Sequence, residues 1–229
     1  MGKGFKIADS DLHLVRALIE SGVLAKIRLA RIAEIRGGFP RVVGLVDCSD
    51  CDQRKRWRRH LELRMKELNR KSRIHPFTLH GGALNIPDAC QVNVDGENGR
   101  VMMRNIVESP DVKKNIGLIL VTTHAPCGKA AAAQISMPEL LQHTFLAEDR
   151  VVAELPQLDP KIQTMPCVHI NFGPWIAGNE KYGMKTYELS RNRWFEWYAG
   201  GSSKSLIQTH YNEQVYERVD ALQALLSRN

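Results

Sequence analysis

Two short groups of metal-binding residues stand far apart in the chain of 229 residues. Residues 48–50 (CSD) directly follow the apolar segment 40–47 (PRVVGLVD), and residues 124–127 (HAPC) follow the apolar segment 116–123 (IGLILVTT). Both apolar segments are typical of buried strands. If these strands are parallel neighbours, they end at the same edge of a sheet and bring two thiolates and an imidazole together, a ligand set that suits zinc. The ligands that would meet there are Cys48, His124 and Cys127.

The fourth ligand of such a site stays open at this stage. In an open site the fourth position holds water, whose pKa zinc lowers to about 7, and Asp50 either accepts a hydrogen bond from that water or binds the metal itself. Cys48 and Cys51 also form a C-x-x-C pair, which with His124 and Cys127 would make a closed, structural Cys3His site. A redox-active pair is a third interpretation, but it assigns no role to His124 or Cys127. We favour the open site, because each group follows a strand and the sheet would hold it in place.

The remaining periodic segments predict a single α/β domain. Strands are expected at 40–47, 76–79, 116–123 and 164–172, and helices at 9–36 (in two stretches), 53–71, 100–114, 138–155 and 212–226. Strands that alternate with helices indicate a mainly parallel central sheet covered on both faces. We therefore expect one domain over 1–229, composed of an N-terminal helical arm (1–37), a core (38–175) and a C-terminal helical region (176–229).

The net charge of +7 arises from one segment. Residues 54–73 contain ten Lys or Arg and two Glu. Within this segment Trp57, Leu61, Met65 and Leu68 recur at helical spacing, which predicts an amphipathic helix that covers the sheet with its basic side in water. A nucleic-acid interface on this basic helix is an alternative that the charge pattern leaves open, although we do not favour it.

The cysteine count and the apolar runs bear on the compartment. Five cysteines are an odd number, and in a reducing compartment metal binding or catalysis is favoured over disulfides. Cys90 and Cys167 are expected to be ordinary buried thiols. No apolar run has the roughly 20 residues of a membrane span, and the first residues lack the apolar core of a secretory signal. We expect a cytoplasmic protein without a membrane contact.

The two groups resemble the zinc-site motifs of the β-class carbonic anhydrases. That family carries C-x-D-x-R after its first core strand and H-x-x-C, usually followed by Gly, after a later strand. Residues 48–50 match the first three positions of the former motif, and residues 124–128 (HAPCG), which end at Gly128, match the latter. The resemblance covers about residues 38–175 and implies a β-carbonic-anhydrase-like α/β fold.

The resemblance also implies a function. It implies zinc-dependent hydration of carbon dioxide to bicarbonate by an obligate homodimer, a lyase of the carbonate dehydratase type. Cys48, His124 and Cys127 would be the zinc ligands, and Asp50 the carboxylate beside the zinc-bound hydroxide. Related members of the family hydrolyse carbonyl sulfide or carbon disulfide, so such a small linear substrate is a further expectation.

Two departures from the family pattern leave a non-catalytic protein with a structural zinc as an alternative. The family Arg that pairs with the carboxylate is replaced by Asp52, and residues 37–40 (GGFP) stand where the family has a substrate-binding Gln. Two histidines are also of interest. His80 precedes a glycine turn that can approach the metal, and His169 alternates with polar neighbours on one strand face, so it lines a polar pocket or pairs with backbone.

Overall fold

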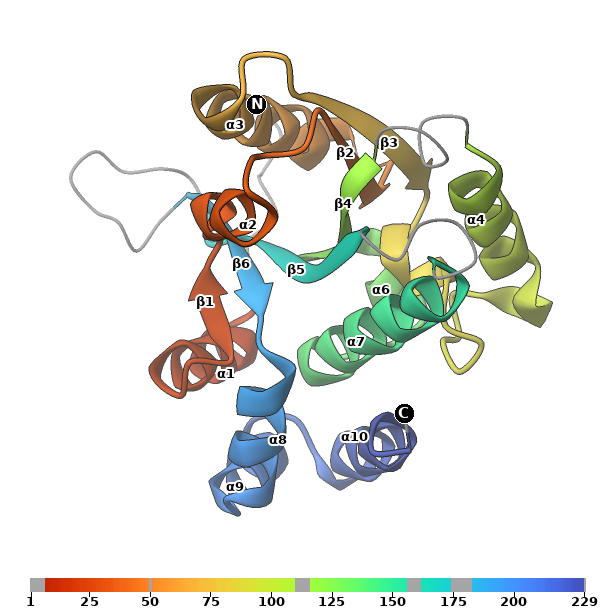
Figure 1. Cartoon of the computed structure of the whole chain (residues 1–229). Helices are drawn as coiled ribbons and strands as arrows, with labels where there is room; N and C mark the ends of the chain where they lie inside the picture. The colour runs from red at the N-terminus through yellow and green to blue at the C-terminus, as the bar shows by residue number, and fades with distance from the viewer. Residues whose placement is uncertain (1–6, 50, 110–115, 156–161, 174–182, 229) are drawn as a thin grey trace.

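The structure is a computed structural model that describes residues 7–49, 51–109, 116–155, 162–173 and 183–228, with only the backbone described at 51–54 and 56. A six-stranded sheet forms its centre, in the order β1-β6-β5-β4-β2-β3 (Figure 1). The strands are β1 (Leu24–Lys26), β2 (Val42–Cys48), β3 (Arg73–Leu79), β4 (Ile116–Ala125), β5 (Gln163–Asn171) and β6 (Met184–Leu189). Strands β3, β2, β4 and β5 are parallel neighbours, whereas β6 and β1 continue the sheet in antiparallel pairing.

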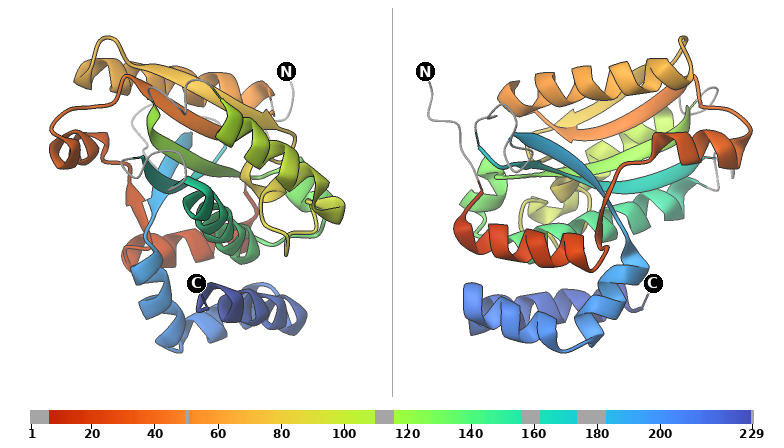
Figure 2. Two further views of the ribbon diagram at one scale, coloured as in Figure 1. Left: turned by 45° about the vertical axis from the view of Figure 1, so that its right-hand side comes forward. Right: turned by 90° about the vertical axis from the view of Figure 1, so that its left-hand side faces the viewer.

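Helices cover both faces of the sheet, as the alternation of segments predicts. Helices α2 and α3 pack on one face, and α4 and α7 on the other (Figure 2). The helices are α1 (Asp9–Glu20), α2 (Leu29–Arg36), α3 (Cys51–Leu68), α4 (Glu97–Glu108), α6 (Gly128–Ala132), α7 (Met137–Glu154), α8 (Arg191–Ala199), α9 (Ser202–His210) and α10 (Glu213–Leu226), with short 3-10 turns η1 (Gly82–Asn85) and η2 (Val94–Gly96). The predicted α/β class with a mostly parallel sheet is confirmed.

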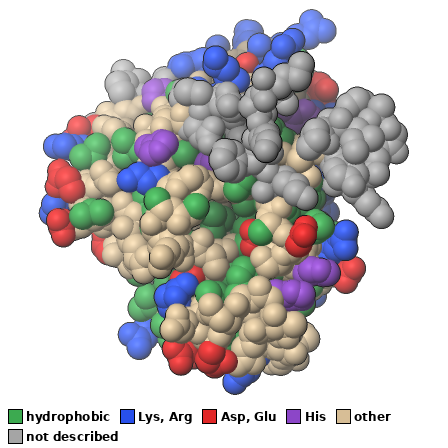
Figure 3. Space-filling view, turned by 180° about the vertical axis from the view of Figure 1, so that it is seen from behind, with side chains coloured by type: hydrophobic (Ala, Val, Ile, Leu, Met, Phe, Trp, Pro, Cys, Tyr) green, Lys and Arg blue, Asp and Glu red, His purple; other side chains and the backbone are tan. Residues whose placement is uncertain are grey.

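The helix predicted from the basic segment has the orientation that its pattern indicates. Trp57, Leu61 and Met65 of α3 are buried against β2, β4 and β5. Lys and Arg side chains gather at the top of the molecule, where α3 lies (Figure 3), and Lys55, Arg59 and Lys66 of α3 are exposed. The apolar stripe thus holds α3 on the sheet through burial of nonpolar surface, while the charged side remains in water.

Two expectations for the ends of the chain are wrong. Residues 24–26 were expected in a helix but form β1, and the C-terminal region, expected to be helical, contains β6. The two strands pair with each other, with Leu24 opposite Leu189. Helical periodicity cannot report this pairing, because a short edge strand takes its hydrogen bonds from a partner more than 160 residues away.

The terminal helices pack on one another. The α8–α10 segment contacts α1 and α7, and buried Trp194 of α8 lies against Phe145 of α7. Tyr211, which follows α9, donates a hydrogen bond to Asp11 of α1. In addition, Arg218 of α10 forms an ion pair with Glu139 of α7. These contacts attach both ends of the described chain to the sheet domain.

Candidate metal centre

Three buried side chains converge where parallel strands end. The Sγ atoms of Cys48 and Cys127 and a ring nitrogen of His124 all lie within 4.8 Å of one another. Cys48 is the last residue of β2, His124 is the penultimate residue of β4, and Cys127 precedes α6. Because β2 and β4 are adjacent and parallel, their carboxyl ends deliver these side chains to one point. The sequence prediction that these three residues meet agrees with the structure.

The two thiols influence each other strongly. A hydrogen bond from the Cys127 thiol lowers the pKa of Cys48 against the opposing effect of burial, and His124 and the Gly81 amide lower it further. The same hydrogen bond and burial raise the pKa of Cys127, although the backbone amides of Ala130 and Lys129 partly offset this. In the absence of a cation the two sulfurs therefore share one proton. A bound cation would replace that proton and allow both to be thiolates.

His124 supplies the clearest test of whether the residues fit a metal. Its side chain is buried, and neither ring nitrogen has a hydrogen-bond partner among the described residues. Buried polar atoms are nearly always paired, so two orphaned nitrogens on one imidazole indicate an absent partner. A zinc ion beside the two sulfurs would be the partner of one of these nitrogens. The residues thus fit zinc, although the structure does not identify the metal.

The glycine turn before η1 contacts the cluster directly. The backbone amide of Gly81 donates a hydrogen bond to Cys48 Sγ over 3.2 Å. A Cβ at Gly82, where φ is +58°, would lie 2.7 Å from the backbone nitrogen of Cys48. Only glycine permits this approach, since both the conformation and the space exclude a side chain. The expected approach of the turn is present, and His80 itself forms a hydrogen bond with Ser49 over 3.1 Å, between Nδ1 and Oγ.

An ion pair fixes the end of β2. Arg58 of α3 donates hydrogen bonds to the carboxylate of Asp47 over 3.1 and 3.3 Å, and also to Thr78 of β3. The Thr78 hydroxyl donates to Asp47 as well, over 3.0 Å. Asp47 immediately precedes Cys48, so this network sets the position of one sulfur. The sequence analysis missed it, although a charged residue inside an apolar strand was a signal that a buried partner had to exist.

His169 lies next to the cluster on the α3 face. It pairs in register with His124 across β5 and β4, and its ring stands 5.7 Å from that of Trp57. Burial, followed by the charges of His124 and His60, lowers the pKa of His169 to about 3. The ring is therefore neutral near pH 7.

Three other predicted site residues are described only in part or not at all. Asp50 lies outside the described residues, and so do the side chains of Cys51 and Asp52. Cys51 is the first residue of α3, and Gly128 is the first residue of α6, directly after Cys127. The positions of the fourth-ligand candidates, Asp50 and Cys51, thus stay predictions.

The two remaining described cysteines are ordinary buried thiols, as expected. Both Cys90 and Cys167 are buried, and burial is the main reason that the pKa of each is raised. A raised pKa keeps a thiol protonated and unreactive at neutral pH. We assign neither residue to the site.

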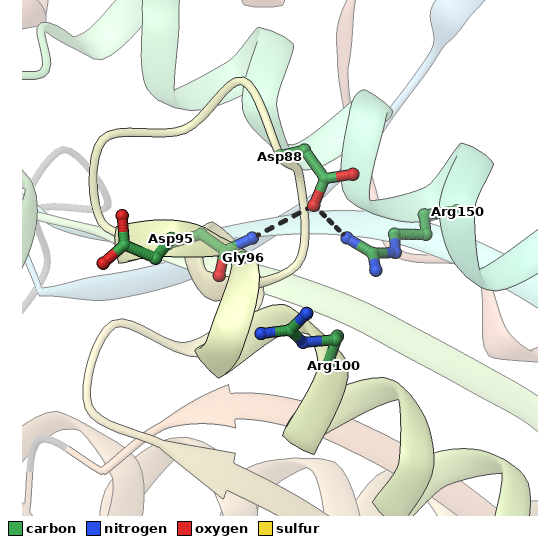
Figure 4. Close-up of a pocket in the computed structure, with 6 residues that line it drawn as sticks. Asp88, Asp95, Gly96, Arg100 and Arg150 are labelled. Carbon is green, nitrogen blue, oxygen red and sulfur yellow. Dashed lines mark hydrogen bonds and ion pairs between the residues drawn. The ribbon is translucent and has the colours of Figure 1, made fainter.

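A shallow hollow lies beside the loop that connects η1 to α4. Figure 4 shows Arg150 beside Asp88, to which it donates a hydrogen bond over 2.5 Å. The side-chain amide of Asn93 also donates to Asp88, over 3.4 Å. Arg150 also donates to the Ile86 carbonyl, while Arg100 pairs with the exposed Glu97. These charges are satisfied by one another. The Arg150 contacts attach the loop to α7.

Comparison with known proteins gives no family assignment. No protein-family model, curated protein or solved structure matches the chain. Among the described helices, none has both the length and the apolar content needed to cross a bilayer. The fold and site therefore define a class, an α/β protein with a buried two-cysteine, one-histidine centre at the edge of a mostly parallel sheet.

Proposed function

We propose that the protein is a zinc lyase that hydrates carbon dioxide reversibly to bicarbonate. The observation that carries this proposal is the buried centre, in which two sulfurs and an unpartnered imidazole meet at the ends of adjacent parallel strands. The motif resemblance stated above adds the reaction. The observed class of fold is compatible with it.

The chain provides three of the four ligands of a tetrahedral ion. Zinc held by Cys48, His124 and Cys127 would lower the pKa of a bound water to about 7 and so supply hydroxide at neutral pH. Addition of hydroxide to the carbon of carbon dioxide would give bicarbonate, and the proton that the water loses would pass to the buffer. Within the proposal, Asp50 accepts a hydrogen bond that directs the hydroxide, and the buried surroundings exclude bulk water from the reacting carbon.

The same geometry would serve a related linear substrate. Carbonyl sulfide and carbon disulfide present the same electrophilic carbon to hydroxide, and the proposal includes them as secondary substrates. By the resemblance, we further propose a homodimer or a higher homo-oligomer. The free thiols of four described cysteines are compatible with a reducing, cytoplasmic compartment.

A structural zinc is the second candidate, and one observation favours it. Helix α3 brings the guanidinium of Arg58 to the end of β2, where an Arg could take the place of the family Arg. The hydrogen bonds of Arg58, however, go to Asp47 and Thr78. With Asp52 in place of the family Arg, Asp50 would be freer to bind the metal, and Cys51 is three residues from Cys48. Either residue as the fourth ligand would close the site.

Two measurements decide between these candidates. The first is stopped-flow hydration of carbon dioxide with a pH indicator, using protein that contains one zinc per chain, with the Cys127→Ser variant as control. A rate above that of buffer supports the lyase, and a rate equal to buffer overturns it. The second is X-ray absorption of the zinc, which gives two sulfur ligands for the open site or for Asp50 as ligand, and three when Cys51 closes it.

A further inference from the structure

The buried nitrogen of His169 extends the site beyond the metal ligands. His169 is the register partner of His124 on the neighbouring parallel strand. Adjacent strands lie about 4.8 Å apart, and partners in register project to the same face of the sheet. The two imidazoles therefore stand side by side on the α3 face.

The two nitrogens of the His169 ring differ in their hydrogen bonding. Nδ1 forms a hydrogen bond with the hydroxyl of Thr186 on β6 over 2.8 Å, and the ring stands at 38° to that of Trp57. Nε2 is buried and has no hydrogen-bond partner among the described residues. Only 5% of the residue is exposed, so bulk water does not supply the missing bond. Such an atom requires a ligand or a bound water.

His169 is not one of the clustered metal ligands. The donor atoms within 4.8 Å of one another are those of Cys48, His124 and Cys127, all on β2, on β4 or just after β4. His169 adds a neutral hydrogen-bonding group on β5, beside the cluster and in the interior of the protein. Its neighbour Trp57 offers an apolar wall on the same side. His169 thus places a hydrogen-bonding atom beside the metal ligands, bordered by the Trp57 ring.

We propose that His169 Nε2 forms a hydrogen bond with an oxygen of the bicarbonate product, or of carbon dioxide, at the open metal position. This inference rests on the proposed function and deepens it, because it assigns a substrate-binding residue. It gives the chain a substitute for the Gln that the segment 37–40 lacks. In the tautomer that this role requires, Nδ1 accepts from the Thr186 hydroxyl, and the hydrogen on Nε2 donates to the bicarbonate oxygen.

The competing role for His169 is purely structural. If a water bridges Nε2 to the free nitrogen of His124, His169 would orient that ligand and contribute to metal affinity. Loss of such a supporting group typically weakens metal binding 10- to 100-fold. Affinity for metal and affinity for bicarbonate thus separate the two roles.

The test uses full-length protein in which cobalt(II) replaces zinc, so that ligand binding is visible in the absorption spectrum. Bicarbonate is titrated into the wild type, His169→Phe and His169→Gln, and cobalt content and affinity are measured for each. We expect unchanged cobalt binding, and bicarbonate binding that is at least about tenfold weaker in His169→Phe, the loss of one good hydrogen bond. His169→Gln, which retains a donor, should recover part of the affinity. His143→Gln, an equally buried histidine on α7 across the sheet, is the matched control and should equal the wild type.

The possible results of this titration separate a failure of the inference from a failure of the proposed function. Equal bicarbonate affinity in the wild type and His169→Phe overturns the inference and leaves the proposed function intact. Weaker cobalt binding with unchanged bicarbonate affinity also overturns it, in favour of the structural role. If wild-type protein binds cobalt but its spectrum does not respond to bicarbonate, the open site itself is absent, and the proposed function fails with the inference. Should His169→Phe not fold, His169→Leu, whose side chain also has no hydrogen-bonding atom, gives the same comparison.

Discussion

Arg58 and Asp47 form a two-point ion pair that ties the middle of α3 to the residue before Cys48. The side chain of Asp47 is 5% exposed and that of Arg58 is 20% exposed. The pair therefore anchors the basic helix, the end of β2 and one sulfur of the metal centre in a single arrangement. Its removal should affect both stability and metal binding.

Replacement of Arg58 by Met should lower the free energy of unfolding by about 2–3 kcal/mol, because the buried Asp47 carboxylate loses the ion pair with the Arg58 guanidinium. The double variant Asp47→Asn with Arg58→Met should recover part of that loss, since it removes the buried charge as well. Urea denaturation measures both. Arg64→Met is the matched control, because its pair with Glu67 is exposed and should change stability by less than about 1 kcal/mol. Equal losses of stability in Arg58→Met and Arg64→Met would show that the Arg58–Asp47 pair stabilises the fold no more than an exposed ion pair does.

Cys127→Ser should weaken zinc binding by more than about 100-fold, because a hydroxyl cannot replace a thiolate at the centre. Competition with a chromophoric chelator measures the affinity, and elemental analysis gives the content. Cys167→Ala is the control, since that thiol lies outside the donor cluster and keeps its proton. If zinc content is the same in the wild type and Cys127→Ser, the metal centre proposed here does not exist.

Gly82→Ala should destabilise the fold by about 3 kcal/mol and also weaken zinc binding. The added Cβ would lie 2.7 Å from the Cys48 nitrogen, at a residue whose φ of +58° already disfavours alanine. Gly37→Ala is matched for φ, at +68°, but its Cβ would meet no atom within 4 Å. It should cost only the backbone strain of about 1 kcal/mol and leave zinc binding unchanged. Thermal unfolding and chelator competition on both variants check this, and similar zinc losses would argue against the close contact.

Stability should fall as the pH drops from 6.5 towards 4, in part through His143 of α7. Burial lowers the pKa of His143 to about 4, and the charge of Glu139 opposes this shift only partly. An unfolded histidine titrates near 6.5, so in this interval the unfolded state binds a proton that the folded state does not. The free energy of unfolding then falls by up to about 1.4 kcal/mol per pH unit from this residue. His143→Gln should show a shallower decline in urea titrations at pH 7, 6 and 5, whereas parallel curves for the two proteins would contradict the prediction.

The exposed basic side of α3 should not bind nucleic acid specifically. Its cationic side chains lie in water while its apolar stripe is occupied by the sheet, so ordinary solvation accounts for the pattern. We expect no retardation of DNA or RNA at physiological salt in a gel-shift assay. Retardation that falls steeply with salt and is lost in a Lys55→Gln, Arg59→Gln, Lys66→Gln variant would instead support the nucleic-acid alternative.

The sequence alone predicted the α/β class and the convergence of the metal-binding residues. Both depend on local information, namely apolar runs such as 116–123 and the residues that directly follow them. Strand ends in a parallel sheet meet at one edge whatever the details of packing, so Cys48 and His124 could be brought together without coordinates.

The tertiary structure decided everything that depends on partners distant in the chain. The β1–β6 pair, the Arg58–Asp47 ion pair and the place of His169 beside His124 could not be derived from spacing. Each is fixed by strand register and side-chain packing between segments whose separation in sequence carries no signal of contact. Local pattern determines which element forms, but the pairing of elements is a property of the whole folded chain, because its energy arises only when distant surfaces are buried together.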